Sequence, residues 1–262
     1  MIASTTERAA ALRGPLLGAV GTLVLVLAWT AVAAAQPEVL VPSPVETARS
    51  LAGLVARGEL LGELAITIAR AAVGVAIALT LGIAWGLGAG LRAAVDDLTR
   101  PARVLLLGIP PVVPLVLATI WLGSGSGVAV LVVVVVTLPP VAVTVQESAR
   151  ELDRDLTEMA RVHQVPPWTR LRHLVLPGTA PALRAAWSFA AAAAVRVTIV
   201  VELLAAPDGV GAAIAAARGR LDTAEVFAWA LVAITAALLV DRLPGRAGRR
   251  HRMRRAGNEA FT

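Results

Sequence analysis

The side chains that most often do covalent chemistry are scarce in this sequence. All 24 basic residues are arginine, because the chain has no lysine, and it has no cysteine. A P-loop needs a lysine to hold phosphates and a Schiff base needs a lysine amine, so neither is available. A thiolate nucleophile and a cysteine-bound zinc ion are excluded in the same way. We therefore expect no catalytic site and no ATP hydrolysis by the P-loop route.

The three histidines are the remaining candidates for metal or acid–base chemistry. His163 and His173 lie ten residues apart in a polar stretch, and His251 lies in a basic tail. Neither stretch offers the partners that a metal site needs. The apolar segments contain no Ser–His pair, and the chain has no H-E-x-x-H motif. We expect surface histidines, no metal, no cofactor and no enzyme activity.

The composition indicates a membrane protein. Hydrophobic residues make up 57% of the 262 residues, charged residues only 16%, and the mean hydropathy is +0.76. Several apolar runs are near twenty residues long, which is the length of a bilayer-spanning helix. The net charge of +6 could suggest a nucleic acid partner. We favour no nucleic acid, because excess arginine in a membrane protein usually collects in cytoplasmic loops.

Six apolar segments are long enough, or nearly so, to cross about 30 Å of hydrocarbon as helices. They are Leu16–Ala35, residues 64–91, Val104–Leu122, Val128–Val145, Ala185–Ala206 and Val226–Val240. In lipid only a helix or a closed barrel satisfies the backbone, and the alternation of a barrel is absent. The sequence therefore predicts an all-α integral membrane fold, a bundle of six transmembrane helices. The first segment ends in Ala33-Ala34-Ala35-Gln36, which resembles a signal-peptidase site, but its length favours a retained helix over a cleaved signal peptide.

The arginines predict the orientation of the bundle. With the N-terminus inside, 18 arginines lie in cytoplasmic segments and 4 in outer segments, while Arg70 and Arg196 lie within spans. The positive-inside rule then places both termini in the cytoplasm of a multi-pass cell membrane protein. We expect a cytoplasmic tail over residues 1–15, a transmembrane domain over 16–243 and a basic cytoplasmic tail over 244–262. That last tail anchors the topology or attracts anionic membrane lipid.

The inner stretch from Gln146 to Arg184 is the longest polar segment and too long for a mere connector. Its first part favours a helix, which Pro166-Pro167 breaks. A second helical piece, Trp168–Leu176, is expected to end at Pro177. A helix–break–helix element on the cytoplasmic side suits docking into a groove of another protein.

This inner loop resembles the E-A-A-x-x-x-G motif, with a trailing L-P, of permease subunits of ATP-binding cassette (ABC) importers. Glu158 and Ala160 match the motif, and Leu176-Pro177 match its trailing pair. Met159 replaces the usual Ala, and Gln164 replaces the usual Gly, where Pro166-Pro167 could supply the break instead. In that family the loop forms the coupling helix that sits in a cleft of the ATPase. The resemblance implies these coupling residues: Glu158, Ala160, Arg161, Gln164, Leu176 and Pro177.

Four further segments are similar to the nitrate, sulfonate and taurine branch of that family. They are Val41–Thr47, Thr67–Gly74, Ile109–Leu115 followed by Trp121-Leu122-Gly123, and Val201–Leu204 followed by Gly209-Val210-Gly211. The resemblance covers about residues 42–243 and implies a type I importer permease that forms the translocation pathway. It also implies a separate ATPase subunit, an extracytoplasmic substrate-binding protein and a second permease copy or paralogue. The expected solute is a small anion such as a sulfonate, taurine or nitrate, although relatives carry pyrimidine vitamin precursors.

Five residues within the spans are candidates for the translocation pathway: Arg70, Pro111, Pro114, Arg196 and Glu202. An arginine at a helix centre costs about 2.5–3.5 kcal/mol on insertion scales. Arg196 therefore either attracts an anion along the pathway or forms a structural ion pair with another helix. Glu202 acts as a gate or makes a packing contact, for example with Arg70, since it lies six residues from Arg196 and cannot pair with it within one helix. The prolines shape a cavity or simply kink their helix.

An ion-gradient-driven secondary transporter is the alternative function. Such proteins normally place acids or broken helices near the membrane midplane. In this sequence Glu202 is the one clear acid within a span, and it lies toward a span's end. The importer permease is therefore the leading hypothesis.

Overall fold

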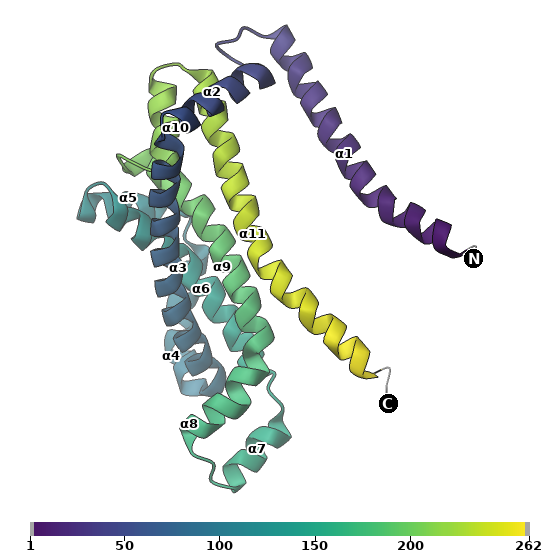
Figure 1. Ribbon diagram of the computed structural model, residues 1–262. Coiled ribbons are helices and arrows are strands. Elements are labelled where there is room, and N and C mark those ends of the chain that lie inside the picture. Colours follow the sequence, from purple (N-terminus) through teal and green to yellow (C-terminus); the bar gives the residue numbers. More distant parts are fainter. Residues whose placement is uncertain (1–2, 260–262) are drawn as a thin grey trace. The chain divides into compact units, whose positions relative to one another are not determined.

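The structure is a computed structural model that describes residues 3–259, with side chains from residue 17 to residue 242 apart from Arg154 and Arg161. This part of the chain consists of helices joined by short connections (Figure 1), which confirms the all-α prediction. The helices are α1 (Ala3–Ala35), α2 (Pro44–Ala56), α3 (Glu59–Leu91), α4 (Ala93–Gly108), α5 (Val112–Leu122), α6 (Ser126–Arg150), α7 (Arg154–Val162), α8 (Pro167–Arg170), the π-helical turn η1 (Leu171–Val175), α9 (Leu176–Ala205), α10 (Val210–Gly219) and α11 (Thr223–Glu259). They divide into a first unit, residues 3–60 with 214–231, and a second unit, residues 61–213 with 232–259.

Five helical segments in the described residues can cross a membrane by length and composition. They are Leu17–Ala35, Glu59–Leu91, Ser126–Arg150, Pro167–Ala205 and Thr223–Arg242. The predicted third span, Val104–Leu122, is broken into α4 and α5, which meet at an angle of 97°, so the kink considered for its prolines is present. Pro110 and Pro111 lie in the break. A proline has no N–H and its ring clashes with the preceding turn, so consecutive prolines end α4.

The bent pair α4–α5 supplies a sixth crossing. Near the start of α3, Arg70 donates from Nε to Oγ of Ser126 at the start of α6, at 2.9 Å. Near the ends of the same helices, Gly90 packs against Ala149. Helices α3 and α6 are therefore parallel, and the chain between them must return along the whole of α6. That helix has 25 residues, so the return covers about 37 Å at 1.5 Å per residue.

Small residues on one face of α3 bring it close to α6. They recur every four residues: Gly74, Ala78, Gly82, Gly86 and Gly90. A Cβ placed on Gly82 would lie 2.8 Å from Cγ1 of Val141, well inside the 3.4 Å at which ordinary contact begins. Lipid offers no hydrophobic drive between helices, so this close packing is what holds the two together. Gly88 lies outside this repeat, and a Cβ there would meet Cγ1 of Val95 at an ordinary 3.6 Å.

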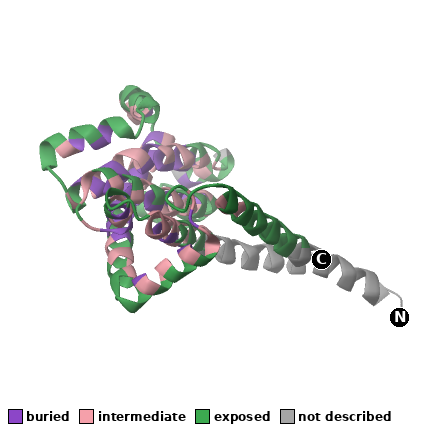
Figure 2. Cartoon of the chain, turned by 90° about the horizontal axis from the view of Figure 1, so that it is seen from above, coloured by how far each residue is buried: buried purple, intermediate pink, exposed green. Residues whose placement is uncertain are grey.

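The core of the second unit lies where α3, α6, α9 and the later part of α11 meet. Val75, Val141 and Ala190 belong to one buried cluster, and Leu115 and Val201 to another that includes α5. In Figure 2 the buried residues gather where helices lie against one another, and the outward faces of the helices are exposed. Much of the exposed surface is apolar, as a surface facing lipid or another subunit must be.

In the first unit, the end of α1 is held by Trp29. Its ring stacks on Phe227 of α11 with ring centroids 5.8 Å apart, and its Nε1–H donates to the Pro42 carbonyl at 3.0 Å. Helix α2 begins with a capping box, in which Ser43 Oγ accepts from Glu46 N and Glu46 Oε2 accepts from Ser43 N. The hydrogen bond from the Ser43 backbone is the largest cause of a lowered pKa of the Glu46 carboxyl.

Candidate functional site

A buried ion pair joins α3 to the end of α9. Arg70 Nη1 lies 3.0 Å from Oε1 of Glu202, and the two side chains are 5% and 0% exposed. The same guanidinium pairs with Asp208 and donates to Ser126. The Thr67 hydroxyl lies 2.8 Å from the second Glu202 oxygen. We call these residues, Thr67, Arg70, Ser126, Glu202 and Asp208, the Arg70 cluster. It ties together α3, α6, α9 and the turn after α9.

Two glycines let the chain fold back directly over Glu202. Gly209 has φ +99°, a conformation that other residues rarely adopt, and a Cβ there would overlap the Glu202 carboxylate. A Cβ on Gly211 would lie 2.6 Å from the backbone nitrogen of Leu203. The Gly211 N–H donates to Glu202 Oε2 at 3.2 Å, and the Gly209 N–H donates to the carboxylate of Glu63. Helix α10 therefore begins against the last turn of α9.

The Arg70 cluster joins two segments that stand far apart in the sequence. Arg70 comes from the segment Thr67–Gly74 at the start of the second span, and Glu202 from Val201–Leu204 at the end of the fifth. The expected contact between Glu202 and Arg70 is confirmed by the distance between them. Sequence reasoning missed Ser126 and Asp208. The signal for Asp208 was its place between Val201–Leu204 and Gly209-Val210-Gly211, directly before Gly209.

Arg196 stands apart from this cluster, on the exposed face of α9. Its Nη2 lies 2.7 Å from Oδ2 of Asp241 on α11, so the structural ion pair considered as an alternative is present. The side chains are 59% and 34% exposed, and the chain therefore does not bury this pair. Sequence analysis missed Asp241 because it follows Val240, the last residue of the predicted sixth span.

Arg196 also borders an apolar groove with a cavity of about 340 Å³. The other residues that line it are Pro111, Val112, Leu115, Val132, Val197, Val200, Val201 and Leu204. Pro111 lies at the break between α4 and α5, so the break borders the groove. Pro114 is buried in the first turn of α5. The groove thus combines one guanidinium with walls of proline, valine and leucine.

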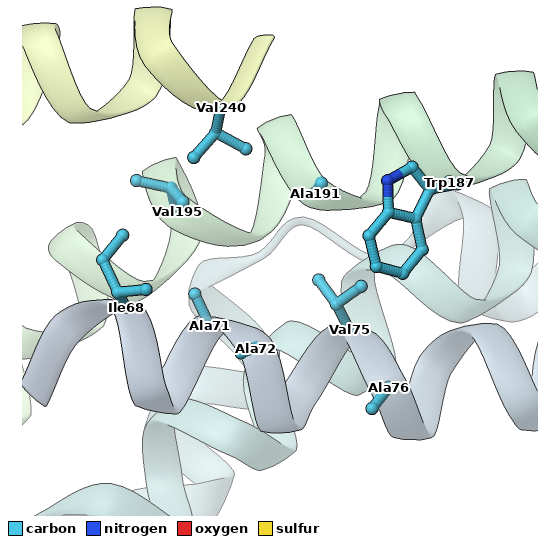
Figure 3. Close-up of a pocket in the computed structure, with 9 residues that line it drawn as sticks. All are labelled: Ile68, Ala71, Ala72, Val75, Ala76, Trp187, Ala191, Val195 and Val240. Carbon is cyan, nitrogen blue, oxygen red and sulfur yellow. The ribbon is translucent and has the colours of Figure 1, made fainter. Parts of the chain in front are cut away.

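A second cavity, of about 180 Å³, lies between α3, α9 and α11 (Figure 3). Helix α3 contributes Val75 and its neighbours, α9 contributes Trp187 and Val195, and α11 contributes Val240. Its lining residues carry no charge. Because an ion loses its hydration without compensation in such a space, the groove at Arg196 is the better place for a charged solute.

The predicted coupling helix is α7, and it ends in a left-handed turn at Gln164. The backbone there has φ +51°, and the Val165 N–H donates to the Ala160 carbonyl at 3.0 Å. This bond across a left-handed residue is the Schellman ending of a helix, a position that favours glycine. The turn is thus made at Gln164 itself, where the family motif has glycine. Pro166 and Pro167 follow the turn and begin α8.

The expectation that a helical piece ends at Pro177 is wrong. Helices α8 and α9, joined by η1, form one helical run, Pro167–Ala205. In the π-helical turn η1 the Leu176 N–H donates to the Leu171 carbonyl, five residues back. This wider turn ends just before Pro177, which then occupies the first turn of α9, where a missing N–H is tolerated. Leu176 and Pro177 are both exposed there.

The loop between α6 and α9 presents apolar side chains outward. Met159, Val162 and Trp168 are 54%, 73% and 69% exposed, and Glu158 is exposed beside them. Ala160 is buried, so one side of α7 faces the protein and another side faces outward. The side chain of Arg161 lies outside the described residues. Exposed apolar side chains on an otherwise polar loop are typical of a protein-docking surface.

A second polar cluster lies at the same end of the unit as this loop. Asp96 Oδ1 accepts from Arg103 Nη1 at 2.8 Å and from Gln146 Nε2 at 2.6 Å. The other carboxylate oxygen of Asp96 accepts from Arg150. The cluster ties the start of α4 to the end of α6, just before the loop begins. Sequence analysis missed it, because Arg103 and Arg150 were counted only as cytoplasmic charges and Asp96 and Gln146 were not considered.

Comparison with known proteins gives the family. Residues 78–250 match the family described as the binding-protein-dependent transport system inner membrane component. The chain is 27% identical over 202 residues to the putative aliphatic sulfonates transport permease protein SsuC of Bacillus subtilis (strain 168), covering 77% of this chain and 73% of the relative. It is 29% identical over 204 residues to the protein of the same description from Escherichia coli (strain K12), covering 78% and 76%.

A solved structure has the same fold. The inward-facing MetNI methionine ABC transporter superposes with a TM-score of 0.64 at 18% identity, over 72% of this chain and 94% of that chain. The apolar helices, the bent pair that completes a sixth crossing and the family match lead to one conclusion. The chain belongs to the family of binding-protein-dependent transport system inner membrane components, the multi-pass permease subunits of ABC importers in the cell membrane.

Proposed function

We propose that this permease subunit carries a small organic anion of the alkanesulfonate type. The observation that carries the proposal is the groove at Arg196, where one guanidinium stands beside apolar walls around about 340 Å³. An alkanesulfonate has the same division into a charged head and an apolar tail. Nitrate would leave the apolar walls unused, and taurine with its sulfonate at Arg196 would place its ammonium group against those walls, where a charge loses its hydration. The descriptions of the two SsuC relatives agree with this solute class.

The partners of the permease follow from its two exposed surfaces. We infer that a separate ATPase subunit binds the loop at Glu158, Met159, Val162 and Trp168, which the arginine distribution assigns to the cytoplasm. The Arg70 cluster lies at the other end of the second unit and therefore on the outer side, where a substrate-binding protein delivers the solute. The groove at Arg196 is open on the surface of one chain, so a second permease copy or paralogue completes the pathway.

One helix connects these parts, which supports a lever-like coupling. The run Pro167–Ala205 has 39 residues, or about 58 Å at 1.5 Å per residue. It begins in the loop that binds the ATPase and carries both Arg196 and Glu202 in its second half. A movement of the loop is therefore passed to the groove and to the Arg70 cluster by a single element, as in a rigid-body gating transition.

Reconstitution of the complete importer tests this function. Vesicles would contain the permease, its ATPase and its binding protein, and uptake of radiolabelled ethanesulfonate would be measured beside ATP hydrolysis. We expect Glu158→Ala to lose most uptake while hydrolysis continues, because the loop no longer transmits closure of the ATPase. Glu151→Ala, an exposed acid in the same loop but outside the motif, is the matched control and should keep both activities. Uptake by vesicles that lack the ATPase would refute the proposal.

A further inference from the structure

We propose that Asp241 is an internal counter-ion, which the solute anion displaces from Arg196 during transport. The proposal rests on the anion transport proposed above and adds Asp241 as a residue that sets the affinity for the anion. It is carried by the geometry of the pair and by the two grooves that Arg196 borders.

The Arg196–Asp241 pair differs sharply from the Arg70–Glu202 pair. Arg70 is 5% exposed and is held by two carboxylates and a serine hydroxyl. Arg196 is 59% exposed, and in the described part of the chain its guanidinium pairs with a single carboxylate at 2.7 Å. A buried, multiply bonded pair is fixed, whereas an exposed pair with one contact exchanges partners easily. The first pair is structural, and the second is suited to exchange.

The surroundings of Arg196 offer a solute access to it. On one side Arg196 borders the groove between α5, α6 and α9. On the other side it borders a groove of about 370 Å³, which is lined by Ile199 of α9 and by Ala233, Ile234, Ala237 and Leu238 of α11. Both grooves are otherwise apolar. An anion that enters either groove meets one cation, and that cation is already neutralised by Asp241.

Such a counter-ion solves two physical problems of a transport site. An arginine without a partner is costly within a membrane, and Asp241 supplies the partner when no solute is present. Conduction also requires that binding be strong enough for entry but weak enough for release. When the solute anion replaces Asp241 on Arg196, two negative groups lie near one cation. Their repulsion weakens the hold on the solute and favours its release.

Three variants of the complete importer test the proposal through ethanesulfonate uptake in vesicles. We expect Asp241→Asn to lower KM about fivefold and also to lower kcat, because the anion is held more tightly and leaves more slowly. A fivefold change corresponds to about 1 kcal/mol, which is the contribution of an exposed ion pair. Arg196→Gln should lose uptake. The double variant Arg196→Gln with Asp241→Asn restores charge balance but should still lack uptake. If the double variant recovers wild-type uptake, the pair is only structural and the proposal falls.

A second readout needs no knowledge of the transported solute. The chain has no native cysteine, so Val200→Cys places a single thiol in the groove, one turn from Arg196. The rates of modification by an anionic and by a neutral methanethiosulfonate reagent are then compared. The anionic-to-neutral rate ratio should rise about fivefold with Asp241→Asn and fall with Arg196→Gln. An unchanged ratio in both variants, or no reaction with either reagent, overturns the proposal even where ethanesulfonate proves not to be the solute.

Discussion

Replacing Gly86 by alanine should push α3 and α6 apart. A Cβ at this position would lie 2.5 Å from the backbone oxygen of Ala142 and 2.8 Å from Cβ of Val145. Neither atom belongs to the far end of a flexible side chain, so the conflict is relieved by movement of a helix. The shortfall from ordinary contact is 0.9 Å, the difference between 3.4 and 2.5 Å. Overpacking of this kind costs about 1–3 kcal/mol.

Gly88→Ala is the matched control on the same helix. Its Cβ would meet Cγ1 of Val95 at 3.6 Å, an ordinary contact. Both substitutions improve helix propensity by about 1 kcal/mol. Because that gain is common to the two variants, the difference between them isolates the packing cost at Gly86.

The measurement is thermal unfolding of the purified chain in detergent, followed by fluorescence-detected gel filtration. A packing cost of about 2 kcal/mol corresponds to a Tm for Gly86→Ala about 4–8 °C below that of Gly88→Ala. Equal Tm values for the two variants would show that α3 and α6 are not packed as closely as the structure indicates. A lower Tm for Gly88→Ala would refute the assignment of the contact face.

Two further predictions concern the loop and the Arg70 cluster. Gln164→Gly should stabilise the left-handed turn at the end of α7 by about 1 kcal/mol. It should therefore tighten binding of the ATPase subunit up to about fivefold in a pull-down titration. Gln164→Ala keeps the Cβ and should not tighten binding, so equal affinities for the two variants would contradict the role of the turn. Glu202→Gln removes the buried carboxylate partner of Arg70, at a cost of about 3 kcal/mol. It should lower Tm by more than Asp241→Asn does, since the Arg196–Asp241 pair is exposed. A larger fall in Tm for Asp241→Asn would mean that the Arg70–Glu202 pair is not the structural one.

Hydropathy alone located the spans, and the charges alone identified their most unusual residues. Apolar length is a local property, so four of the six segments match helices within a few residues, and the fifth ends one residue from its helix, which begins much earlier, at Pro167. The third is bent by 97° at Pro110 and Pro111. Its prolines indicated a kink, but a count of apolar residues gives no measure of how sharp the bend is. At Pro177 the sequence predicted a helix end that the structure does not have. The π-helical turn before Pro177 lets the helix continue past the proline, and no residue pattern predicts such a turn.

The partners of the predicted site residues were harder to predict. Glu202 was expected to pair with a basic residue of another span, and few were available, so Arg70 could be named from the sequence. Asp241 and Asp96 could not be named, because each lies outside the apolar segments where a search for functional charges begins. The left-handed backbone of Gln164 could not be predicted from its residue type, because glutamine rarely adopts that conformation. Only the comparison with the family motif, which has glycine at this position, pointed to it.

The repeat of small residues along α3 has a consequence for how the protein reaches a single native alignment. Each glycine of the repeat meets the α6 residue 59 positions later, such as Gly82 with Val141 and Gly86 with Val145. Sliding α3 by one four-residue step would put Gly82 opposite Val145, an equally good fit, so these residues alone leave two alignments nearly equal in energy. The hydrogen bond from Arg70 to Ser126 exists in only one of them. A polar contact at one end thus selects the alignment of an otherwise ambiguous interface, as a buried asparagine does in a coiled coil.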